Sequence, residues 1–186
     1  MCGSTSEPVT AISASSASSN FLTAEWRDLV MINYEVGPET LASRVPAGTT
    51  LDLRHGRALV TAVGFQFLDT RVRGIAVPFH RDFDEATCVF MCSVAVATKS
   101  GSEAAFVTQR HWGYTRQRDG STVEYHVAHP LWRVCRARDA IFETDVPSIV
   151  AARGPISAYL VDGSAVQVSE PRHDLVARRA LDGQNH

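Results

Sequence analysis

The chain has 186 residues, of which 45% are apolar and 20% charged, and its formal net charge is -2. A chain of this length buries roughly 70% of the surface that it exposes when unfolded, so one hydrophobic core is expected without disulfides or metals. Its balanced charge leaves no excess of basic residues, and no apolar run approaches the roughly 20 residues that span a bilayer, so we predict neither a nucleic-acid nor a membrane partner.

Residues 1–20 are rich in serine and alanine and lack the positive start and compact apolar stretch of a secretory signal. We expect a disordered tail there, a single globular β-domain over residues 21–169, and a polar tail over residues 170–186. Cys88 and Cys92 would lie about 13 Å apart in a strand, too far for a disulfide. Buried free thiols indicate a reducing compartment, so we predict a cytoplasmic protein.

The first predicted elements follow an alternation of period two. Trp26–Val36 reads as a half-buried strand, although Trp26, Arg27 and Asn33 could point either outward or into a cavity. A short helical turn is expected from Pro38 to Arg44, because Pro38 suits a helix start and Pro46–Gly48 stops it. Residues 49–54 and 57–69 then predict a hairpin around His55–Gly56, with a central second strand.

The later elements are also predicted to be strands. Thr87–Thr98 is a nearly continuous apolar run that favours a buried strand, and Val134–Glu143 is a weaker strand, followed by a helical turn at Pro147–Ala152. Two Asp-Gly pairs predict tight hairpins, which comprise Phe106–Arg118 with Ser121–His129, and Ala158–Val161 with Ser164–Val168. The pattern predicts a mainly β fold, an antiparallel barrel-like or curved sheet with few short helices.

One candidate site lies on the hairpin around Asp119–Gly120. If the loop has two residues, His111 and His126 become diagonal neighbours close to Glu124. These groups could perform acid–base catalysis or bind a ligand, and two histidines with a glutamate could also bind a metal. The residue types favour a simpler interpretation, the solvent face of a half-buried hairpin, so we assign no metal site.

A second candidate site is the segment Pro78–Glu85, where charges of both signs alternate with phenylalanines. At a barrel mouth, His80 and Arg81, together with Arg27 from the first strand, could bind a carboxylate. A surface loop with exposed ion pairs is the interpretation that residue types favour. Lys99, the only lysine, fits a solvated strand end.

Four stretches together resemble the YqjF-like family of unknown function, DUF2071: FLTAEWRDLVMINYEV, the run from GTTLDLRHGR to FHRDFDEA, EAAFVTQRHWGYTRQRDGSTVEYHVAHPLWRV, and ISAYLVDGSAVQV. The resemblance implies a fold similar to acetoacetate decarboxylase, which is an antiparallel, barrel-like architecture with a central cavity. Family members look longer between FHRDF and HWGYTRQRDG, where this chain has only TCVFMCSVAVATKSGS. The barrel is therefore expected to be incomplete. No residue matches the Schiff-base lysine of the decarboxylase, and no cofactor is implied.

Three functions are compatible with these patterns, and whether the protein is an enzyme stays open. The first is binding of a small organic acid in a central cavity bordered by Arg27, His80, Arg81, His111, Glu124 and His126. The second is a non-catalytic, shortened remnant that acts through an exposed sheet edge beside Thr87–Thr98, which would also allow a homo-oligomer. The third is a metal-dependent hydrolase that uses the histidines and the glutamate.

Overall fold

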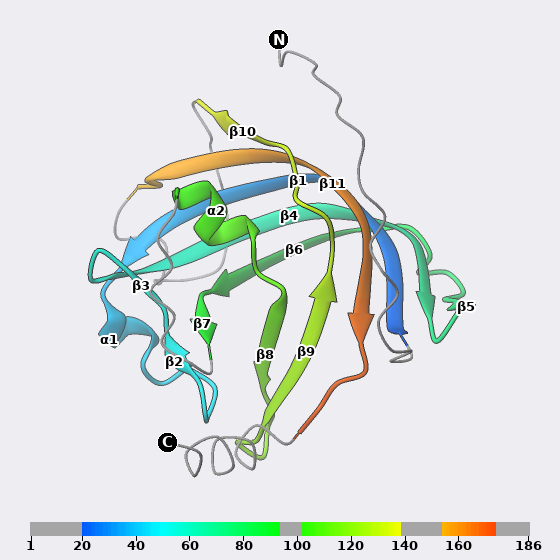
Figure 1. The fold of residues 1–186 in the computed structure, drawn as a ribbon, viewed down its shortest axis with the longest axis horizontal. Helices are drawn as coiled ribbons and strands as arrows, with labels where there is room; N and C mark the ends of the chain where they lie inside the picture. Colours follow the sequence, from blue (N-terminus) through cyan, green and yellow to red (C-terminus); the bar gives the residue numbers. More distant parts are fainter. Residues whose placement is uncertain (1–19, 94–101, 139–153, 174–186) are drawn as a thin grey trace.

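The computed structural model describes residues 20–93, 102–138 and 154–173. Within them the chain is mainly β, and one antiparallel sheet curls into a half-barrel (Figure 1). The two predicted tails, Lys99, residues 94–98 and 139–143, and the predicted turn at Pro147–Ala152 lie outside the described residues, apart from a few residues at the inner end of each tail.

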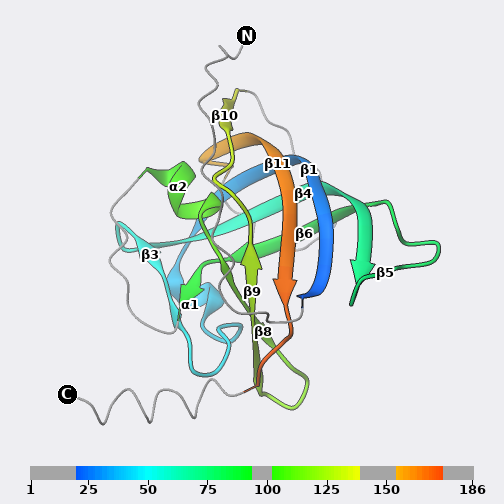
Figure 2. The same cartoon turned by 45° about the vertical axis from the view of Figure 1, so that its right-hand side comes forward.

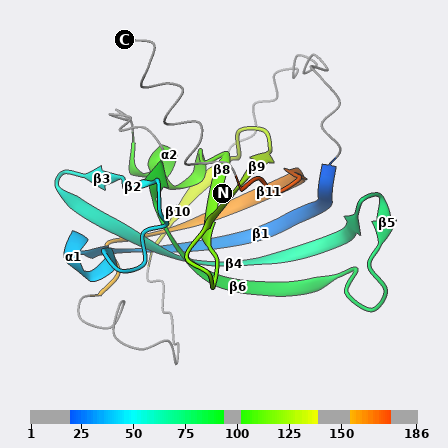
Figure 3. The same cartoon turned by 90° about the horizontal axis from the view of Figure 1, so that it is seen from below.

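The long strands of the sheet run side by side, and the strands that follow curl over them (Figures 2 and 3). The main path has the order β3-β4-β1-β11-β9-β8, while β5 and β6 pair with β4, β10 pairs with β11, and β2 pairs with β7. The helices are α1 (Pro38–Leu41) and α2 (Glu103–Thr108), and the strands are β1 (Asn20–Val36), β2 (Thr50–Leu51), β3 (Leu53–Arg54), β4 (Arg57–Val72), β5 (Ile75–Ala76), β6 (Phe83–Phe90), β7 (Cys92–Ser93), β8 (Trp112–Arg116), β9 (Thr122–Ala128), β10 (Val134–Ala137) and β11 (Ser157–Ser169).

The first half of the chain folds largely as its alternation predicts. β1 lies between β4 and β11, and β3 and β4 form the expected hairpin, in which His55 and Gly56 have φ values of 51° and 74°. Such paired positive φ values are typical of the turn that matches strand twist. The predicted helical turn begins at Pro38 but ends at Leu41.

Two bulges curve the pairing of β1 with β4. The register shifts between Arg27 and Val30, where β1 carries the extra residue Asp28, and between Thr23 and Glu25, where β4 carries the extra residue Asp69. Both aspartates have positive φ, 52° and 49°. A bulge bends its strand and increases the local twist, so these two positions help the sheet to curl.

The hairpin predicted around Asp162–Gly163 is wrong, because β11 runs continuously from Ser157 to Ser169. Gly163 has a φ of +78°, and it pairs with Arg27, one residue before the bulge at Asp28. An Asp-Gly pair supplies a positive φ for a tight turn, but the same conformation also occurs within a bent strand.

The hairpin predicted from Phe106 to His129 is right only in part. Residues Phe106–Thr108 belong to α2 instead of a strand, and the Ser102 hydroxyl caps that helix by accepting a hydrogen bond from the Ala105 N–H. The loop has three residues rather than two, because Gln117 and Ser121 still bond across it. Trp112 therefore pairs with His126, where the two-residue loop predicts Gly113.

The buried strand predicted at Thr87–Thr98 is also wrong in its environment. β6 starts earlier, at Phe83, and its residues Ala86 to Val89 are exposed. Among the described residues, β6 pairs with β4 alone, so its apolar residues lie at an edge of the half-barrel. An apolar run does not distinguish a central strand from such an edge.

The sheet carries a core on each face. On the convex face Leu41 of α1 packs with Ile32, Tyr34 and Ala62. On the concave face α2 packs over Leu29 and Met31, and a polar chain ties the helix to three strands. In that chain Thr61 donates to Asn33, Asn33 donates to Ser157, and Ser157 and Tyr159 both donate to Glu103.

Candidate functional site

A cavity of about 640 Å³ lies on the concave face. Its wall comes from β1, β4, β6, β8 and β9 and from the segments around α2. Most of the lining is apolar, and its Trp, Phe and Tyr side chains are Trp26, Phe65, Phe67, Phe83, Phe90, Trp112, Tyr114, Tyr125 and Trp132. A concave apolar wall with a few polar groups is the usual form of a small-molecule site.

Trp26 is at the centre of the aromatic wall. Its ring centroid lies 5.0 Å from that of Phe65 and 6.2 Å from that of Trp132. The Trp132 indole N–H donates to the Ser164 hydroxyl at 2.8 Å, whereas the Trp26 indole N–H is buried with no hydrogen-bond partner among the described residues. The sequence left the direction of Trp26 open, and the structure places its ring on the cavity wall while Arg27 is exposed.

Arg110 supplies the guanidinium of the cavity wall. Its Nη1 lies 2.6 Å from Asp52 Oδ2, its Nε donates to the Phe106 carbonyl at 2.8 Å, and its charge lies 4.5 Å from the Phe106 ring centroid. Ser93 donates to the other Asp52 oxygen at 2.7 Å. Arg110 Nη2 is buried and has no hydrogen-bond partner among the described residues, an arrangement that typically costs about 1–3 kcal/mol.

Arg27, His80 and Arg81 lie away from this cavity. All three are exposed, and none is among the residues that line it in the part of the chain that the structure describes. Arg27 forms an exposed ion pair with Glu25, and the His80 ring lies beside the Pro78 carbonyl.

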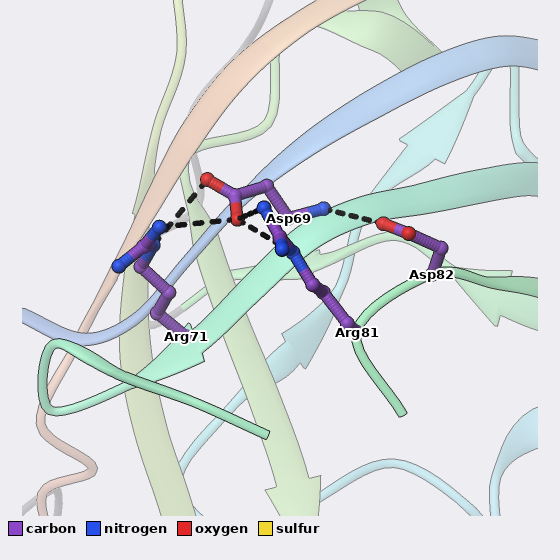
Figure 4. A network of polar contacts seen from close by, with 4 residues as sticks. All are labelled: Asp69, Arg71, Arg81 and Asp82. Atoms are coloured by element: carbon purple, nitrogen blue, oxygen red, sulfur yellow. Dashed lines mark hydrogen bonds and ion pairs between the residues drawn. The ribbon is translucent and has the colours of Figure 1, made fainter. Parts of the chain in front are cut away.

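Arg81 instead supports the bulge at Asp69 (Figure 4). Its Nη2 lies 2.7 Å from Asp69 Oδ1, Arg71 binds the same carboxylate, and the Asp69 N–H donates to Asp82 at 2.8 Å. Hydrogen bonds from Arg71 and Arg81 hold the pKa of Asp69 below its usual value. These contacts hold the positive-φ conformation that curves β4.

His111 and His126 are brought together, as the sequence predicts, with ring centroids 6.0 Å apart. Glu124 on the same hairpin is buried, and its backbone pairs with Arg172. None of the three is among the described residues that line the cavity, but His129 is. The His129 ring stacks between His111, at 4.5 Å, and Trp132, at 3.9 Å. Within the described ranges, no group of three or more His, Cys, Asp or Glu side chains could hold a metal ion.

The histidine stack predicts a dependence of stability on pH. Burial lowers the pKa values of His126 and His129 below the usual 6.5, and their histidine neighbours lower them further. As the pH falls, the unfolded chain takes up protons at a higher pH than the folded chain does. The contribution of the two histidines to the free energy of unfolding should therefore be complete above about pH 6.5 and decrease as the pH falls below it.

Urea unfolding at a series of pH values would measure this effect. We expect His129→Gln to have a flatter profile than the wild type between pH 7.5 and 5, since the variant lacks one depressed site. His80→Gln, which changes an exposed ring, is the matched control and should keep the wild-type profile. Superimposable profiles for the wild type and His129→Gln would contradict the prediction.

Comparison with known proteins identifies a family and no individual relative. The family model DUF2071, described as an uncharacterized conserved protein, matches residues 23–88 and 86–165. The two matched stretches meet within β6 and together cover more than half of the chain. No curated protein and no solved structure matches, so the likeness to the acetoacetate decarboxylase fold stays a prediction. Among the described residues, no helix is long and apolar enough to cross a membrane.

Proposed function

The chain belongs to the DUF2071 family of uncharacterised conserved proteins, and from this premise we propose that its half-barrel binds a small organic acid in the concave cavity. The observation that carries the proposal is the 640 Å³ cavity with its aromatic wall, whose volume lies within the range of small-molecule sites. Apolar side chains provide room for the carbon skeleton, and Arg110 provides a positive charge at the wall.

The proposal is one of binding and requires no covalent step. A Schiff base needs an amine, and Lys99, the only lysine of the chain, lies outside the described residues. All three tryptophans of the chain, Trp26, Trp112 and Trp132, line the cavity, so their fluorescence should change when a ligand enters.

Two neighbouring residues of β6 provide a matched test. Thr87 and Ala86 are both exposed, but only Thr87 lines the cavity. In a thermal-shift screen with small carboxylic acids, at least one acid should raise the melting temperature of the wild type, because a ligand that binds the native state stabilises it. Thr87→Trp should abolish that shift by filling the cavity mouth.

The control Ala86→Trp adds the same bulk on the same strand but away from the cavity, and it should retain the shift. The proposal is wrong if no acid stabilises the wild type, or if Thr87→Trp and Ala86→Trp respond alike.

A second function is favoured by the edge at β6. Ala86 to Val89 form an exposed run without charge or proline, and within the described part of the chain β6 pairs with β4 alone. Unprotected edges of this kind favour pairing with another strand. Sedimentation of the wild type should then show a dimer that Val89→Lys dissociates, whereas a wild type that stays monomeric at high concentration would exclude this function.

A further inference from the structure

Arg110 is the only arginine or lysine among the described residues that line the cavity. We infer that its guanidinium binds the carboxylate of the ligand, and that the ligand class is monocarboxylic acids with an apolar body. This inference rests on the proposed function, because it assigns the polar end of the same site.

The contacts of Arg110 leave one nitrogen of the guanidinium, Nη2, without a hydrogen-bond partner among the described residues. Asp52 occupies Nη1, the Phe106 carbonyl occupies Nε, and the Phe106 ring covers one face. The N–H groups of Nη2 are buried without an acceptor among the described residues, and a carboxylate oxygen that enters beside them as the neighbouring wall adjusts would supply one. Hydrogen bonds between a guanidinium and a carboxylate are among the stronger ones in proteins, because both partners are charged.

Asp52 acts here as a positioning residue. Its side chain is 8% exposed, and it is held by Ser93 on one oxygen and by Arg110 on the other. Together with the Phe106 carbonyl, it fixes the plane of the guanidinium before any ligand arrives. A side chain that is already ordered loses less entropy when it binds.

The rest of the wall argues against a second carboxylate. Glu85 is the acidic residue among the described lining residues, and the described lining holds no second arginine or lysine that a second carboxylate could pair with. The remaining surface is largely aromatic and aliphatic, where an unpaired charge would lose its hydration without compensation. One carboxylate at Arg110 and an apolar body against Trp26 and Phe65 therefore fit the cavity.

Three probes of equal chain length separate the possibilities by calorimetry on the full chain: octanoate, octanamide and octanedioate. We expect octanoate to bind roughly tenfold or more tightly than octanamide, since both partners are charged when a carboxylate accepts from the guanidinium and only one is charged when an amide accepts. Octanedioate should bind more weakly than octanoate. Equal binding of octanoate and octanamide, or tighter binding of octanedioate, would overturn the inference and leave the cavity-binding function standing. If none of the three binds, the inference fails, and the thermal-shift screen decides the proposed function.

A paired substitution tests the residues themselves. Arg110→Gln alone would leave the Asp52 carboxylate buried without its counter-charge. The informative variant is therefore Asp52→Asn with Arg110→Gln, which removes both charges together. This double variant should bind octanoate no better than octanamide, whereas the wild type prefers octanoate. Arg133→Gln, which removes an exposed arginine that does not line the cavity, should keep the full preference. If the double variant keeps the preference, Arg110 does not bind the carboxylate.

Discussion

Gly163→Ala is expected to lower the free energy of unfolding by about 3 kcal/mol or more, through backbone strain and a steric clash acting together. Gly163 has a φ of +78°, and a Cβ atom there would overlap the Trp26 carbonyl oxygen and lie 2.8 Å from Leu29 Cδ1. Backbone atoms of the paired strand cannot move aside without breaking the β1–β11 pairing. Urea denaturation followed by circular dichroism would measure the loss.

Gly120→Ala is the matched control for the clash. Gly120 has a similar φ of +85°, but among the described residues no atom beyond its two chain neighbours lies within 4 Å of the position that a Cβ would take. That variant should lose only the conformational cost, about 1–2 kcal/mol. If the two variants lose the same amount, the close approach of β1 to Gly163 contributes nothing to stability.

Arg110→Met is expected to lower the free energy of unfolding by about 3–5 kcal/mol, because it leaves the Asp52 carboxylate buried without its counter-charge. The Arg110 and Asp52 side chains are only 16% and 8% exposed, so little water can replace the lost partner. Chemical denaturation at neutral pH provides the measurement.

The double variant Asp52→Asn with Arg110→Met separates the two origins of that loss. It also removes the unpaired charge of Asp52, so it should be more stable than Arg110→Met alone. A loss below about 1 kcal/mol in Arg110→Met would mean that the pair behaves like an exposed one. A double variant no better than the single one would place the loss in the Phe106 contacts instead.

Local pattern predicted the first half of the fold well. Alternation identified β1, and the His55–Gly56 pair identified the turn before β4, because both signals act over a few residues. In the second half of the chain, local signals of this kind do not determine the structure. Asp162–Gly163 carries the same dipeptide as Asp119–Gly120, yet one lies in a continuous strand and the other in a hairpin loop. Whether an Asp-Gly pair forms a loop or stays within a strand depends on the strand beside it, and a local sequence pattern contains no information about that neighbour.

The candidate site depended even more on distant contacts. Arg27 and Arg81 looked suited to a carboxylate by residue type, but their exposed partners Glu25 and Asp69 hold them away from the cavity wall. Arg110 was not distinguished from other arginines, because its partner Asp52 is 58 residues away. The one local signal that could have found it is Ser102 as a helix cap, since Arg110, a lining residue, lies two positions beyond the end of the helix that follows.

The position of β1 in the middle of the sheet has a consequence for folding. β1 pairs with β11 from Asn20 with Ser169 to Asn33 with Ser157, so nearly the whole domain separates the two partners in sequence. During synthesis β1 can pair early with β4, but its other edge must wait for β11. Folding rates fall as contacting residues become more distant in sequence, so refolding should take milliseconds to seconds. Until β11 has been synthesised, the N–H and C=O groups along that edge of β1 stay unpaired and can pair with another chain.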